Sequence, residues 1–175
     1  MISILITDNK ILVLMACFNG AKYIQEQIDS IQKQTRDDWV LIIRDDGSSD
    51  DSIFIINKII EQDKRIILLK DKYTPTGLAQ LNFNYLLKYA QTQKADYIFL
   101  SDQDDVWLPN KIESFVTAVK KSNIHDSTPL LVHSDLEVVD HNLDTLSTSL
   151  VNSIGLTPNK TNNISALTFQ NCVTG

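Results

Sequence analysis

The chain has 175 residues, a net charge of −6 and 43% hydrophobic residues, which predicts one folded domain spanning residues 1–175. The acidic balance argues against a protein that binds nucleic acid mainly through charge, so no nucleic-acid partner is expected. The two cysteines, Cys17 and Cys172, are far apart, and the absence of Cys/His ligand spacing argues against a zinc site.

Apolar runs alternate with helical patterns along most of the chain. The runs predict strands at 11–16, 39–43, 66–69, 97–100 and 130–134, and helices begin near residues 21, 50, 78 and 110. A long loop with one short helix is expected over 142–163 and a last strand over 166–173, while 2–7 fits either an extra strand or a leader. This order predicts an α/β fold, a mainly parallel twisted sheet with helices on both faces.

Polar segments follow the predicted strands at the points where the strands end. They are Cys17–Gly20, Asp45–Ser48, Thr76–Gly77 and Asp102–Asp105. Because parallel strands end at the same edge of a sheet, we expect these loops to line one crevice.

The acidic segment after the fourth strand carries Asp102, Asp104 and Asp105. Like charges so close together raise one another's pKa unless solvent, protonation or a cation relieves them. Carboxylate oxygens suit Mg²⁺ or Mn²⁺, especially beside a phosphate, although a solvated turn would show the same pattern. The glycines form neither a dinucleotide fingerprint nor a P-loop, so the pattern favours a metal-bound nucleoside diphosphate.

Three segments together resemble family 2 glycosyltransferases of the GT-A fold, the nucleotide-diphospho-sugar transferase type, and particularly their bacterial rhamnosyltransferase-like branch. They are Met15–Gly20, Asp45–Asp50 and Ser101–Trp107, in the family's order and approximate spacing. The similarity extends over residues 11–175.

The resemblance implies a nucleotide-sugar donor, a UDP-sugar or a dTDP-sugar. Ala16, Phe18 and Asn19 look like the lining of the nucleobase pocket. Asp46, with Asp45 beside it, looks like the acidic residue that contacts the base or the ribose, although turn formation and helix capping are the alternative role for this pair.

The segment Asp102-Gln103-Asp104 looks like the family's DxD motif. The resemblance implies that Asp102 and Gln103 lie on the donor side and that Asp104, with Asp102 and Asp105 as further ligands, binds a divalent cation, Mn²⁺ or Mg²⁺. Gly77 and Asn82 resemble the segment that closes over the donor.

The chain also departs from the family pattern. Cys17-Phe18 stands where the family often has Thr-Tyr, and Pro75 stands where it often has Asn. The later acidic motif that supplies the family's general base is expected beyond residue 175, so the chain is interpreted as a donor-binding part truncated at its C-terminus. An exposed core would then favour self-association.

The expected reaction is metal-dependent, inverting sugar transfer to a glycan or lipid-linked acceptor in cell-surface polysaccharide synthesis. The expected place is the cytoplasm, with segments outside this sequence providing any attachment to the inner face of the membrane. One alternative is a nucleotide-sugar-binding fragment without catalytic activity. Another is a sugar nucleotidyltransferase, which is disfavoured because Phe18–Lys22 is not a Gly-rich basic loop.

Overall fold

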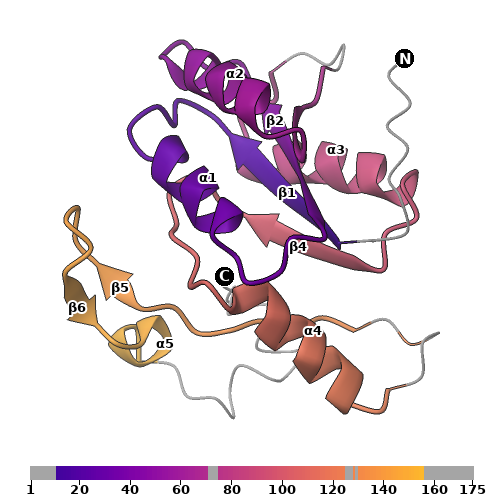
Figure 1. Cartoon of the computed structure of the whole chain (residues 1–175). Helices are drawn as coiled ribbons and strands as arrows, with labels where there is room; N and C mark the ends of the chain where they lie inside the picture. Colours follow the sequence, from indigo (N-terminus) through magenta and orange to yellow (C-terminus); the bar gives the residue numbers. More distant parts are fainter. Residues whose placement is uncertain (1–10, 71–74, 125–127, 129, 156–175) are drawn as a thin grey trace. The chain divides into compact units, whose positions relative to one another are not determined.

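The computed structural model describes residues 11–70, 75–124, 128 and 130–155 (Figure 1). It contains two compact units whose boundary lies between Asn123 and Ile124. The single domain expected over 1–175 stays a prediction.

The first unit alternates strands and helices. Its elements are β1 (Ile11–Cys17), α1 (Ile24–Gln32), β2 (Trp39–Asp45), α2 (Ser52–Gln62), β3 (Ile66–Leu68), α3 (Ala79–Gln91), β4 (Tyr97–Ser101) and α4 (Lys111–Lys121). These bounds confirm the first four predicted strands and the helices between them, to within a few residues at each end.

The strands form a parallel sheet in the order β3-β2-β1-β4. In the register, Ile11 is paired with Trp39 of β2 and with Tyr97 of β4. All seven residues of β1 are buried, as expected for an apolar strand in the middle of a sheet that is covered on both faces.

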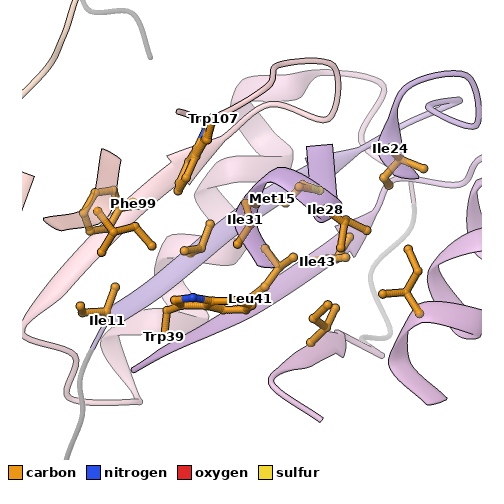
Figure 2. Close-up of a cluster of buried hydrophobic side chains, with 14 of the residues drawn as sticks. Ile11, Met15, Ile24, Ile28, Ile31, Trp39, Leu41, Ile43, Phe99 and Trp107 are labelled. Atoms are coloured by element: carbon orange, nitrogen blue, oxygen red, sulfur yellow. The ribbon is translucent and has the colours of Figure 1, made fainter. Parts of the chain in front are cut away.

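Two apolar cores lie on opposite faces of this sheet. One contains alternate residues of β1, including Ile11 and Met15, together with isoleucines of α1 such as Ile28 (Figure 2). Val13 of β1 and Ile112 of α4 belong to the same core, as do two isoleucines of α2. The other contains Leu12 and Leu14 with α3. The period of two along β1 therefore sends consecutive side chains into different cores, and the predicted helices on both faces are confirmed.

The second unit differs from the prediction. Residues 130–134 were expected to form a fifth strand, but they are not a strand in the structure. The second unit instead contains a hairpin of β5 (Val138–Val139) and β6 (Thr145–Ser147), followed by α5 (Leu150–Ser153). An apolar run predicts burial, but a strand also needs a partner, and no described strand pairs with 130–134.

The short helix α5 confirms the one expected inside the long loop. The predicted strands at 2–7 and 166–173 lie outside the described residues. None of the described helices has the length and apolarity needed to span a membrane.

Candidate functional site

The carboxyl ends of β2, β1 and β4 are neighbours at one edge of the sheet. The parallel register places Cys17 beside Asp45 and Met15 beside Ser101. The loops that follow these strands therefore leave the sheet from adjacent positions, where open α/β sheets bind their ligands. The structure thus brings together three of the four polar segments that the sequence predicted to converge, namely those after β1, β2 and β4.

The loop after β1 is held by side chains of the loop after β2 and of Ser52, the first residue of α2. The hydroxyl oxygens of Ser48 and Ser52 accept hydrogen bonds from the backbone N–H groups of Asn19 and Gly20, each at 2.8 Å. The side-chain oxygen of Asn19 accepts in turn from the backbone N–H of Ser49 at 2.9 Å. Asn19 has a φ of +49°, a left-handed conformation that asparagine tolerates better than most residues.

The carboxylate of Asp45 closes the turn after β2. Its Oδ2 accepts from the backbone N–H groups of Gly47 and Ser48, both at 2.9 Å. A pocket of about 300 Å³ opens beside this turn, lined by Asp45, Gly47, Ile53, Leu68, Leu69, Lys70 and Pro75. The pocket is open to solvent, and its walls combine apolar side chains with the charged groups of Asp45 and Lys70.

Asp46 is buried and forms an ion pair with Arg44, with 2.8 Å between Oδ1 and Nη1. Its Oδ2 also accepts from the Thr76 hydroxyl and the Gly77 N–H, each at 2.8 Å. Burial alone would raise the pKa of Asp46, but the hydrogen bonds from Thr76, Arg44 and Gly77 outweigh it and hold this pKa below its ordinary value. Asp46 therefore fastens the Thr76–Gly77 loop to the end of β2.

Asn82 of α3 lies buried beneath the same strand ends. Its Oδ1 accepts from Nη1 of Arg44 at 2.9 Å, and its Nδ2 donates to the carbonyl oxygens of Arg44 and Cys17 at 3.3 and 3.4 Å. The Arg44 guanidinium also lies 4.8 Å from the ring centroid of Tyr85. In contrast, Gly77 has open space around it and a φ of +66°.

The acidic loop after β4 holds three carboxylates of like charge. Burial raises the pKa of Asp102 and of Asp105, and their acidic neighbours in the loop raise both further. Lys111 opposes these shifts with its positive charge, while burial lowers its own pKa. Within the part of the chain that the structure describes, no hydrogen bond or ion pair reaches the carboxylates of Asp102, Asp104 or Asp105.

The donor set of this loop suits a hard divalent cation that also binds a phosphate. Among the described residues, no group of three or more His, Cys, Asp or Glu side chains is arranged to hold a metal ion. However, Mg²⁺ typically binds one or two protein carboxylates and completes its shell with phosphate oxygens and water. The carboxylates of this loop therefore fit a cation shared with a phosphate, rather than a closed site made by the protein alone.

The remaining predicted donor residues lie in different environments. Ala16 is buried in the core on the α3 face, whereas the Phe18 side chain is 52% exposed. The carboxamide of Gln103 hydrogen bonds to the backbone of Phe18.

Buried polar side chains of α1 and of the turn after it, which the sequence analysis did not single out, support the acidic loop and the start of α4. The Gln27 carboxamide oxygen accepts from Ser101 Oγ at 2.6 Å and from Trp107 Nε1 at 3.2 Å, and its nitrogen donates to Ser30 Oγ and to the carbonyl oxygen of Asp105. Gln34 accepts from the Ile112 N–H at 3.0 Å and donates to the Leu108 carbonyl at 2.8 Å. The sequence does contain one signal that Gln27 is buried. Gln27 directly precedes Ile28, which belongs to the apolar stripe of α1, so its side chain lies close to the buried face of the helix.

The chain is similar in sequence to proteins named as bacterial glycosyltransferases. The chain is 33% identical over 136 residues to the Escherichia coli UDP-Glc:alpha-D-GlcNAc-diphosphoundecaprenol beta-1,3-glucosyltransferase WfgD, a match that covers 77% of this chain and 49% of that protein. It is 34% identical over 109 residues to the dTDP-rhamnosyl transferase RfbG of Shigella flexneri, covering 62% of this chain and 38% of that protein. The chain thus spans half or less of the length of these relatives.

Solved structures show the same fold. TarS 1-349 of S. aureus, crystallised with UDP, has a TM-score of 0.56 at 22% identity over 64% of this chain and 32% of that one. The mannosyltransferase PcManGT of Pyrobaculum calidifontis, in complex with GDP-Man and Mn²⁺, has a TM-score of 0.52 at 22% identity over 63% of this chain and 31% of that one. Both support a GT-A type of fold for this chain.

The family profile described as Glycosyl transferase family 2 matches residues 12–171, which include all three polar segments at the strand ends. Sequence, strand topology and relatives therefore agree, and the chain belongs to glycosyl transferase family 2.

Proposed function

We propose that this chain binds the nucleoside diphosphate-sugar donor of a bacterial glycosyltransferase. The whole enzyme would transfer the sugar, with inversion, to a glycan or lipid-linked acceptor in cell-surface polysaccharide synthesis. The relatives named above act with UDP-glucose or dTDP-rhamnose by their names, so a UDP-sugar or a dTDP-sugar is the proposed donor.

One observation carries this proposal. The Asp45 pocket lies at the carboxyl end of β2 and the acidic loop follows the carboxyl end of β4, so both are at the same edge of the sheet. The pocket of about 300 Å³ next to Asp45 is the proposed nucleobase and ribose site. The acidic loop, two strands away in the sheet order, is the proposed diphosphate side. A nucleoside diphosphate has the corresponding chemistry, with a partly apolar base at one end and metal-binding oxygens at the other.

The proposed donor site keeps the residues expected from the sequence. Those in or near the loops after β1 and β2 are Ala16, Phe18, Asn19, Asp45 and Asp46, and the others are Gly77, Asn82, Asp102 and Gln103. Several of them have hydrogen-bond partners within the chain, so their proposed contribution is to shape the loops that surround the donor.

The proposed cation ligands are Asp104, Asp102 and Asp105, and Mn²⁺ or Mg²⁺ is the proposed ion. When bound, such an ion would supply positive charge to a departing diphosphate. The chain's own part is to hold these carboxylates together despite their repulsion, so that the site is ready before the donor arrives. The general base that activates the acceptor hydroxyl is proposed to lie outside this sequence.

Calorimetric titration of UDP and dTDP, with and without Mn²⁺, tests the proposal. We expect binding that depends on Mn²⁺ and weakens at least about tenfold in Asp104→Asn, which keeps the side chain's shape and removes its charge. Glu61→Gln is the matched control, because it removes an exposed charge on α2 and should bind as the wild type does. A nucleotide affinity that is the same with and without Mn²⁺, and the same in Asp104→Asn as in the wild type, would contradict the proposed cation site.

A fragment that binds the donor without transferring its sugar is the second candidate, favoured by the share of the relatives' length that this chain spans. Incubation with UDP-glucose and Mn²⁺, followed by chromatography for released UDP, separates the two candidates. Turnover supports an enzyme, whereas binding without turnover supports the fragment.

A further inference from the structure

Gln103 stands between two of the acidic residues, yet its side chain is directed to another loop. Its Oε1 accepts from the Phe18 N–H at 2.8 Å, and its Nε2 donates to the Phe18 carbonyl oxygen at 2.9 Å. Both backbone groups of one residue are thus satisfied together, as they would be by a neighbouring strand. A neutral side chain with a donor and an acceptor in fixed geometry is required, and among long side chains glutamine provides it.

Gly20 provides the space that this arrangement needs. A Cβ atom on Gly20 would lie 2.4 Å from Oε1 and 2.7 Å from Cδ of Gln103, closer than real Cβ contacts. The Gly20 backbone is not in the left-handed region, so close approach rather than backbone freedom explains a glycine here. Gln103 and Gly20 are therefore two halves of one contact.

The acidic loop needs such a contact for an electrostatic reason. Repulsion among the carboxylates of Asp102, Asp104 and Asp105 tends to spread the loop, and no described hydrogen bond or ion pair holds those carboxylates. The loop is fixed on the α1 side by Gln27. On the other side, the two hydrogen bonds of Gln103 connect it to the loop after β1.

We propose that Gln103 is a positioning residue, a clamp that sets the acidic loop against the loop after β1 and so fixes the cation site relative to the nucleobase pocket. This inference rests on the proposed function and gives Gln103 a role other than direct contact with the donor. If the carboxamide bound the donor directly, it would have to give up both hydrogen bonds to Phe18.

Amide hydrogen exchange in the ligand-free chain tests the clamp independently of the proposed function. In Gln103→Ala, the Phe18 amide should exchange about fivefold faster or more, as expected from the loss of one hydrogen bond. The control is Gln91→Ala, which removes the exposed glutamine side chain at the last residue of α3. An unchanged NMR spectrum elsewhere shows that the fold is intact, and unchanged exchange at Phe18 would overturn the clamp.

Nucleotide binding then tests its function. The factor by which Mn²⁺ increases the affinity for UDP is the quantity to compare. We expect this factor to be about tenfold smaller in Gln103→Ala and in Gly20→Ala than in the wild type. The double variant should be no worse than Gln103→Ala alone, because the side chain that the added methyl group would meet is gone. Direct contact with the donor predicts a different result, namely that Gln103→Ala weakens binding while Gly20→Ala leaves it unchanged.

The two proposals fail in distinguishable ways. No binding of UDP or dTDP by the wild type under any condition would overturn the proposed function and, with it, the positioning role. Normal binding with unchanged Mn²⁺ dependence in both single variants would overturn the positioning role alone.

Discussion

At the scale of single residues, the bond between Arg44 and Asp46 is where a small change should have a large effect on stability. Asp46→Asn keeps the shape but removes the charge that faces Arg44 Nη1 at 2.8 Å and that accepts from Thr76 and Gly77. Buried hydrogen bonds to a charged group are worth about 1.5–3 kcal/mol, so urea denaturation should show a loss of about 2–3 kcal/mol. Asp51→Asn is the control, because Asp51 is exposed and its side chain forms no capping hydrogen bond with α2. The free energy of unfolding of this variant should fall by less than about 0.5 kcal/mol. Equal losses in both variants would contradict this assignment.

The free energy of unfolding should also fall in acid, and the pKa of Asp63, which follows α2, indicates the pH range in which it falls. Hydrogen bonds from Arg65 and Gln32 lower the pKa of Asp63 to about 2. A carboxylate with a folded pKa below its unfolded value of about 3.9 stabilises the protein above about pH 4, and this stabilisation is lost as the pH falls toward 2. Urea unfolding at several pH values should therefore show a shallower decline in Asp63→Asn than in the wild type. A decline as steep as that of the wild type would show that other groups dominate.

The sequence could indicate which residues gather at the site, but not what each side chain binds. Four of the predicted site residues are polar side chains in loops or near the start of a helix, namely Asn19, Asp46, Asn82 and Gln103. Residues that contact a ligand and residues that hydrogen bond one loop to another show this same pattern. The structure gives each of them a partner elsewhere in the chain. The contact of Asn19 with Ser48 joins residues 29 apart and that of Gln103 with Phe18 joins residues 85 apart, and such pairings depend on the folded sheet.

At the scale of elements, α1 is both a core helix and the support of the acidic loop. Gln27→Leu would remove the buried acceptor of Ser101 Oγ and Trp107 Nε1. Leaving buried donors unsatisfied costs about 1–3 kcal/mol, and urea denaturation should show that loss. Gln25→Leu on the exposed side of the same helix is the matched control and should be nearly neutral. If both variants kept wild-type stability, the polar row of α1 would not support the loop.

The local sequence pattern was sufficient to predict the helices and strands whose apolar side chains pack into a core. β1, β2 and β4 are apolar runs, and α1 carries Ile24, Ile28 and Ile31 on one face, so period and length predicted them. The 130–134 segment is also apolar but pairs with no described strand, and the β5–β6 hairpin consists of only two and three residues. Short strands contain too few residues to establish a period, so the sequence could not predict them.

At the scale of the whole molecule, β4 predicts self-association, because it has no strand partner on its outer side among the described residues. In the described sheet β4 is at the edge, and its Ile98 and Leu100 are 43% and 46% exposed. Unpaired edge strands with apolar side chains favour pairing with another chain. Sedimentation velocity should show a concentration-dependent dimer that Leu100→Lys weakens, while Phe54→Lys, at an equally apolar exposed position on α2, does not. A monomer at all concentrations would refute the expectation.

The strand order also has a consequence for how the chain acquires its structure. β1 is paired with β2, which follows it closely, and with β4, which follows only after β3 and α3. Contacts between distant residues form late because they close long loops. We therefore expect the half of the sheet beside the Asp45 pocket to assemble first and the acidic loop to be placed last. Pulse-labelling of refolding chains should then protect β2 amides before those of β4. During synthesis, an emerging chain would accordingly form the Asp45 pocket before its acidic loop was in place.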